Sequence, residues 1–170
     1  ASSFTATSFI SFPPQGFSWK WYLAVWENRA FAEALWLSLV VASITALVSG
    51  AIGAAAAIGL YRGEFRGRDL VLQLLSLPLI IPAVVLGVGL LQFFARLGML
   101  NGPHVLVLAH VVITLPYVVR LVLAGLAGSD PNLERAAAGL GAGPLRIFFR
   151  VTLPRGARGL AAGMIFAFVV

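Results

Sequence analysis

Three long stretches of the chain carry no charged residue: Ala34–Tyr61, Leu70–Ala95 and Leu97–Val119. Each is longer than the roughly 20 apolar residues that a helix needs to cross about 30 Å of hydrocarbon. Lipid offers no hydrogen-bond partners to backbone N–H and C=O groups, so a membrane segment must pair them internally, as a helix does. The strands of a membrane β-barrel would alternate apolar and polar residues, and these stretches do not. The pattern therefore predicts membrane helices over 34–61, 70–95 and about 105–126.

A fourth apolar run, Gly159–Val170, is too short to cross a bilayer by itself. We expect it to begin another membrane helix, over 159–170 onward. The chain does not begin with Met and stops inside this apolar run. We therefore expect 1–170 to be a single transmembrane domain and a fragment of a longer protein, with one further helix before Ala1.

Basic residues are unevenly distributed between the predicted loops, and such a bias sets membrane orientation because cytoplasmic loops collect Lys and Arg. One side holds eight arginines: Arg62, Arg66, Arg68, Arg135, Arg146, Arg150, Arg155 and Arg158. The other side holds Lys20, Arg29 and Arg96. This count predicts that the segment 127–158 is a cytoplasmic loop and that 1–33 is extracytoplasmic or interfacial.

Aromatic residues crowd the predicted extracytoplasmic segment, at Phe17, Trp19, Trp21, Tyr22 and Trp26. Amphipathic rings settle at lipid headgroups, so these residues are typical of an interfacial belt. A contact surface for an external partner is the alternative interpretation.

Small residues recur every four positions in the first predicted span, at Ser49, Gly53 and Ala57. Such faces let membrane helices approach closely where lipid supplies no hydrophobic driving force. The pattern predicts a bundle, with the contact either within the chain or between chains.

Prolines interrupt two of the predicted spans, with Pro78 and Pro82 in the second and Pro116 in the third. Each removes a helical hydrogen bond and favours a kink. The kinks indicate either a hinge or pore-lining bend, or the ordinary tolerance of membrane helices for proline.

The composition agrees with a membrane protein, since 60% of residues are hydrophobic, 11% are charged and the mean hydropathy is +0.97. The net charge of +6 could suggest nucleic acid, but arginine-rich cytoplasmic loops explain it better. Absence of cysteine excludes disulfides and thiolate metal sites.

No catalytic, metal or cofactor site is evident in the sequence, and neither a phosphate-binding Walker pattern nor a metalloprotease pattern occurs. The ionisable residues within the apolar stretches are His104, His110 and Arg120. A proton relay would need carboxylates, and none lies between Asp69 and Asp130. We therefore expect hydrogen-bonded histidines and an arginine that extends toward the headgroups.

The predicted cytoplasmic loop contains a short amphipathic helix, beginning after the N-cap pair Asp130-Pro131. Its apolar stripe has alanines at the centre, so a partner could approach closely; Ala137 is the residue we expect to face that partner. The stripe consists of Leu133, Ala136, Ala137 and Leu140. Glycines at 139, 141 and 143 should end the helix, with Gly141 at positive φ.

Pro144 should begin a second short helix, which we expect to end at Leu153-Pro154 before the last span. An amphipathic helix lying on the bilayer surface is the alternative for this loop, above all for 144–150. The central alanines of the first helix would insert poorly into lipid.

The loop resembles the cytoplasmic signature of ABC importer permeases, which reads Glu-Ala-Ala, three residues, Gly, nine residues, Ile, one residue, Leu-Pro. The corresponding residues here are Glu134, Arg135, Ala136, Ala137, Gly141, Val151, Leu153 and Pro154, with the same spacing. Arg135 replaces the signature Glu and Val151 replaces Ile. Glu134 stands one position earlier, about 100° around the helix.

Other stretches are similar to spermidine/putrescine-type permeases, namely Phe17–Tyr22, Tyr61–Gly67 and Leu115–Arg120. The resemblance implies an all-α polytopic bundle in the bacterial inner membrane, with a cytoplasmic coupling helix. The implied partners are ABC ATPase subunits that bind ATP and Mg²⁺, a second permease and an external solute-binding protein. The implied solute is a polyamine; related subgroups carry iron, thiamine, phosphonate or sulfate.

Two other classes remain as alternatives. A secondary transporter or channel would need intramembrane carboxylates or a selectivity ring, which the sequence lacks. A membrane scaffold would have no need of an ATPase-docking helix.

Overall fold

The computed structural model describes residues 16–127 and 132–170, and all regular structure in these ranges is helical. The α-helices are α1 (Lys20–Glu27), α2 (Arg29–Arg62), α3 (Arg68–Ser76), α4 (Ala83–Arg96), α5 (His104–Ala127), α6 (Asn132–Gly139), α7 (Pro144–Ile147) and α8 (Leu153–Val169). A 3₁₀ turn, η2 (Leu77–Leu79), precedes α4, and a π-helical turn, η3 (Phe148–Thr152), precedes α8. The chain divides into two units, 1–40 and 41–170.

The first unit contains α1 and the beginning of α2. Asn28 begins α2 because its Oδ1 accepts the Phe31 N–H at 3.2 Å, which is the N-cap bond expected of asparagine. The aromatic rings of Phe17, Trp19, Trp21, Tyr22 and Trp26 are exposed, Trp26 to 87%.

Helices α2 and α5 are long and apolar enough to cross a membrane, and they cover the predicted spans 34–61 and 105–126. Helix α5 continues through Pro116 without interruption. Helix α8 begins six residues before the predicted 159.

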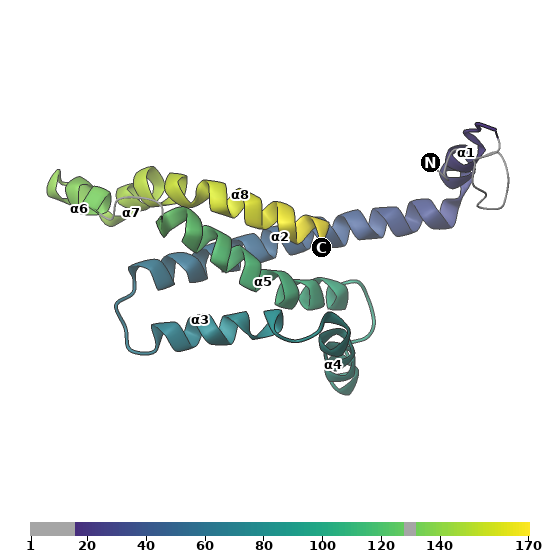
Figure 1. Ribbon diagram of the computed structural model, residues 1–170, viewed down its shortest axis with the longest axis horizontal. Helices are drawn as coiled ribbons and strands as arrows, with labels where there is room; N and C mark the ends of the chain where they lie inside the picture. Colours follow the sequence, from purple (N-terminus) through teal and green to yellow (C-terminus); the bar gives the residue numbers. More distant parts are fainter. Residues whose placement is uncertain (1–15, 128–131) are drawn as a thin grey trace. The chain divides into compact units, whose positions relative to one another are not determined.

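The predicted span over 70–95 is sharply bent at its prolines, where kinks were expected. Helices α3 and α4 are separate and meet at an angle of 98° (Figure 1). Pro82 has an extended ψ of 133° and supplies no N–H, so the helix that ends after Leu79 must restart at Ala83. The pair is a broken span or a re-entrant loop.

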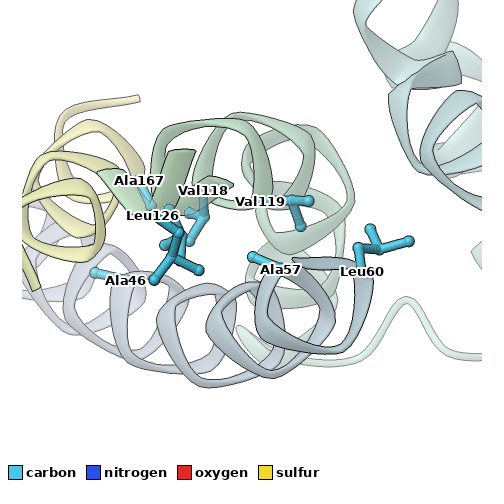
Figure 2. Close-up of a cluster of buried hydrophobic side chains, with 8 residues drawn as sticks. Ala46, Ala57, Leu60, Val118, Val119, Leu126 and Ala167 are labelled. Carbon is cyan, nitrogen blue, oxygen red and sulfur yellow. The ribbon is translucent and has the colours of Figure 1, made fainter. Parts of the chain in front are cut away.

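The core of the second unit lies where α5 packs against α2 and α8. Figure 2 shows the side chains of Val118, Leu126 and Ala167 gathered between these helices. The buried apolar residues are Ala46, Ala57, Leu60, Val118, Val119, Val122, Leu126 and Ala167. Alanines on α2 and α8 face valines on α5, so the helix axes can approach closely.

Helix α8 approaches α5 through glycine. A Cβ on Gly159 would lie 2.2 Å from the Leu121 carbonyl oxygen, and one on Gly163 would lie 3.1 Å from Val118 Cα. These are backbone atoms, which cannot rotate away as a side chain can. Gly159 is therefore required for the α5–α8 contact.

The stripe of small residues on α2 is used within the chain. Ser49, Gly53 and Ala57 are all buried, and a Cβ on Gly53 would lie 2.6 Å from Val118 Cγ1. The Ser49 and Thr114 hydroxyls are 2.8 Å apart, and Thr114 also donates to the His110 carbonyl at 2.8 Å. The stripe predicted a bundle, and the structure shows that α5 is the helix it contacts.

Candidate functional site

Helix α6 ends in the glycine-dependent way predicted, and Gly141 is the residue responsible. Its φ is +82°, and its N–H donates to the Ala138 carbonyl at 2.9 Å. The Ala142 N–H donates to the Ala137 carbonyl at 3.0 Å, which completes a Schellman motif. The predicted N-cap pair Asp130-Pro131 lies outside the described residues.

The apolar stripe of α6 is mostly open to solvent. Leu133 and Ala136 are exposed, and Leu140 is exposed to 90%. Ala137 is half-buried, so the open edge runs through Ala136 rather than through Ala137. An exposed leucine beside a small residue is a surface that another protein can cover.

The predicted end of the second short helix at Leu153-Pro154 was wrong. Helix α7, the π-helical turn η3 and α8 follow one another without a gap from Pro144 to Val169. Pro154 has no N–H to donate to the preceding turn, and its ring crowds that turn. The chain widens locally into the π-turn, as helices do where one hydrogen bond is displaced.

Glu134 lies on the side of α6 that faces the rest of the chain. There it connects the first part of the signature, 134–141, with the second part, 151–154. Thr152, between Val151 and Leu153 of the second half, donates its hydroxyl to Glu134 Oε1 at 2.7 Å. Arg62 Nη2, at the end of α2, lies 3.0 Å from Glu134 Oε2. Arg62 also donates to the Thr152 hydroxyl, so that all three side chains are connected.

A second arginine completes this group, which we call the Glu134 cluster: Tyr61, Arg62, Glu134, Thr152 and Arg155. Arg155 Nη1 lies 3.9 Å from Glu134 Oε1, and Nη2 donates to the Tyr61 hydroxyl at 3.3 Å. The Arg155 side chain is only 11% exposed, and its Nε and Nη1 have no hydrogen-bond acceptor among the described residues. The Glu134 carboxylate therefore forms ion pairs with two guanidinium groups, those of Arg62 and Arg155.

Arg135 occupies the position of the signature glutamate and is exposed. It borders a hollow of about 330 Å³ together with Arg62 and Glu134. A neighbouring hollow of about 400 Å³ is lined by Leu133, Val151 and Pro154 and by two arginines, Arg150 and Arg155. The exposed side of the loop thus combines apolar and cationic groups.

Little in the sequence pointed to the Glu134 cluster. None of its members belongs to the Ala-Ala stripe, and Tyr61 and Arg62 lie at the end of α2, about 70 residues earlier in the chain. The one available signal was the single acidic residue, Glu134, among five arginines over 132–158. A lone carboxylate in a basic segment commonly has a basic partner.

Two of the ionisable residues of the apolar helices, His110 and Arg120, make side-chain hydrogen bonds. His110 Nδ1 lies 2.7 Å from the Leu106 carbonyl oxygen, which can only accept, so Nδ1 is the donor. Arg120 Nε and Nη2 donate to the Ser76 hydroxyl at 3.3 and 3.1 Å. Arg120 therefore connects α5 to the end of α3, beside the break before α4.

Comparison with known proteins matches residues 49–170 to the family described as "Binding-protein-dependent transport system inner membrane component". The spermidine/putrescine transport system permease protein PotC of Haemophilus influenzae is 33% identical over 92% of this chain and 61% of its own length. The putrescine transport system permease protein PotI of Escherichia coli is 33% identical over 91% of this chain and 58% of its own.

A third relative, the molybdate/tungstate transport system permease protein WtpB of Pyrococcus abyssi, is 31% identical over 93% of this chain and 63% of its own length. The chain thus spans about three fifths of the length of the curated relatives it matches. Relatives named for cationic and for anionic solutes match at similar identity.

Proposed function

Because the chain belongs to the family of binding-protein-dependent transport system inner membrane components, we propose that it is a permease subunit of a bacterial ABC importer. It lies in the inner membrane and forms one half of the solute path, with a second permease subunit as the other half. The polytopic helical fold, with two or three apolar spans among the described residues, supports this role.

In this proposal the chain hydrolyses no ATP itself. A separate ATPase subunit binds ATP and Mg²⁺ and docks on α6, and closure of the ATPase pair displaces α6. The displacement of α6 moves the membrane helices between outward- and inward-open states. An external binding protein delivers the solute and supplies most of the selectivity.

Polyamines are the solute class that we propose, because relatives named for spermidine and putrescine match over nine tenths of the chain. The WtpB relative supports an oxyanion as the alternative. Uptake of labelled spermidine and of labelled molybdate by cells expressing the whole importer would decide between them. Saturable spermidine uptake is the expected result.

The observation that carries the docking proposal is the open edge of α6, formed by Leu133, Ala136 and Leu140. Helix α6 buries none of its residues among the described parts of the chain, although half of them are apolar. An amphipathic helix whose apolar edge is uncovered is one half of an interface.

Replacing Ala136 with tryptophan should prevent the ATPase from docking. Ala136 is exposed, so the larger side chain fits the isolated chain but collides with a closely packed partner. Overpacking typically costs about 1–3 kcal/mol, and the upper end lowers affinity by about 100-fold. The measurement is recovery of the ATPase with the tagged permease from solubilised membranes.

Ala24→Trp provides the matched control, because Ala24 is also exposed but lies on α1, in the other unit. It should leave ATPase recovery unchanged. Recovery of the ATPase at wild-type level with Ala136→Trp would count against docking on this edge.

A further inference from the structure

We propose that Glu134 is a positioning residue that fastens α6 to the ends of α2 and α8, so that a displacement of α6 moves both helices. This inference rests on the proposed function, because it describes how the docked helix transmits its movement. The ATPase is proposed to bind the open edge of α6. Glu134 lies on another side of the helix, which faces the rest of the chain.

The attachment of α6 depends on polar contacts. None of its residues is buried, whereas the helices to which it is fastened contribute to the apolar core. Glu134 reaches α2 through Arg62 at 3.0 Å and η3 through Thr152 at 2.7 Å. Thr152 is fully buried and immediately precedes α8, so the hydroxyl is a fixed anchor.

The charges in the cluster make Glu134 the central member. The side chains of Glu134, Arg62 and Arg155 are 20%, 35% and 11% exposed. By contrast, the Arg29–Glu33 pair on α2 is 92% and 67% exposed, so water screens it far more. Removing the Glu134 charge would leave the Arg62 and Arg155 guanidinium groups without their shared carboxylate, and two buried Arg155 nitrogens already lack an acceptor among the described residues.

A rigid connection has a mechanical consequence. Tyr61 and Arg62 are the last residues of α2, and Arg155 lies in the first turn of α8. Helix α2 packs on α5 through Gly53, and α8 packs on α5 through Gly159. A force on α6 therefore reaches both helices that flank α5, through one carboxylate.

The test uses the complete importer with its ATPase and binding protein, reconstituted in proteoliposomes, and measures solute accumulated per ATP hydrolysed. Glu134→Gln keeps the size of the side chain and removes its charge. We expect normal ATPase recovery and continued ATP hydrolysis, with the solute-to-ATP ratio lowered about tenfold, which lies within the range of typical couplings between distant sites.

Arg62→Gln is the second variant, and it is the less disruptive of the two because Glu134 then keeps Thr152 and Arg155 as partners. It should lower the same ratio, and Arg62→Lys should restore it in part. In the double variant the two effects should be less than additive, since both substitutions remove the same contact. Glu64→Gln and Arg66→Gln, exposed residues of the α2–α3 loop, are the matched controls.

Each outcome separates the two proposals. If Glu134→Gln abolishes ATPase recovery, Glu134 belongs to the docking surface and the positioning role is overturned. If the solute-to-ATP ratio is unchanged in both Glu134→Gln and Arg62→Gln, the positioning role is likewise overturned while docking stands. If Glu134→Gln fails to accumulate in the membrane, Arg62→Gln and its lysine rescue decide the result.

Discussion

Gly159→Leu should prevent the second unit from folding. A Cβ at this position would lie 2.2 Å from the Leu121 carbonyl oxygen, 2.8 Å from its carbon and 3.0 Å from Val122 Cα. A collision with backbone cannot be relieved by a rotamer change, so α5 and α8 would have to separate. Overpacking typically costs about 1–3 kcal/mol, and we expect this substitution to exceed that range.

The measurement is the thermal unfolding midpoint of the detergent-solubilised protein, together with its yield from membranes. Gly87→Leu on α4 is the matched control, because no atom lies within 4 Å of a Cβ built there. The control should retain wild-type yield. A folded Gly159→Leu protein with an unchanged midpoint would mean that α5 and α8 do not pack as the structure shows.

Gly141→Val should uncouple ATP hydrolysis from solute uptake. Gly141 has φ +82° at the C′ position of α6, and its Schellman hydrogen bonds hold the chain as it turns toward α7. A left-handed conformation costs an L-residue roughly 1–2 kcal/mol, and a β-branched side chain costs more. The turn would open, α6 would shift, and uptake should fall at least about tenfold while the ATPase remains active.

Uptake and hydrolysis are measured together in proteoliposomes containing the complete importer. Gly141→Asn should retain most activity, because asparagine tolerates the left-handed region. Gly139→Ala is a second control, because it adds a side chain to the last residue of α6 without changing Gly141. No atom lies within 4 Å of a Cβ built on Gly139. Equal uptake by the valine and asparagine variants would show that the conformation of Gly141 is irrelevant to coupling.

Much of the fold followed from local pattern. The charge-free stretches located α2 and α5, and the position of Gly141 after the Ala-Ala stripe located the end of α6 and its positive φ. These features depend on residues that are neighbours in the chain. The prolines predicted kinks in two spans, but the local pattern did not distinguish the complete break at Pro82 from α5, which continues through Pro116.

The candidate site was only half visible in the sequence. The signature spacing identified the loop and the residues of the open edge, and Ala136 and Leu140 are indeed exposed. Ala137, expected to face the partner, is half-buried. Which side of a short helix lies against the chain depends on the loops at both ends, and periodicity alone does not specify it.

Taken alone, the sequence determined that the chain is helical and belongs to the family of binding-protein-dependent transport system inner membrane components, because apolar length and signature spacing are properties of consecutive residues. Only the tertiary structure decided that the small-residue stripe of α2 packs on α5, that Gly159 lies against the α5 backbone, and that Glu134 contacts Arg62 and Thr152. These contacts join residues that are 18 to 72 positions apart in the chain. Residues so far apart meet only when the helices pack, and the local sequence pattern does not specify which of them will meet.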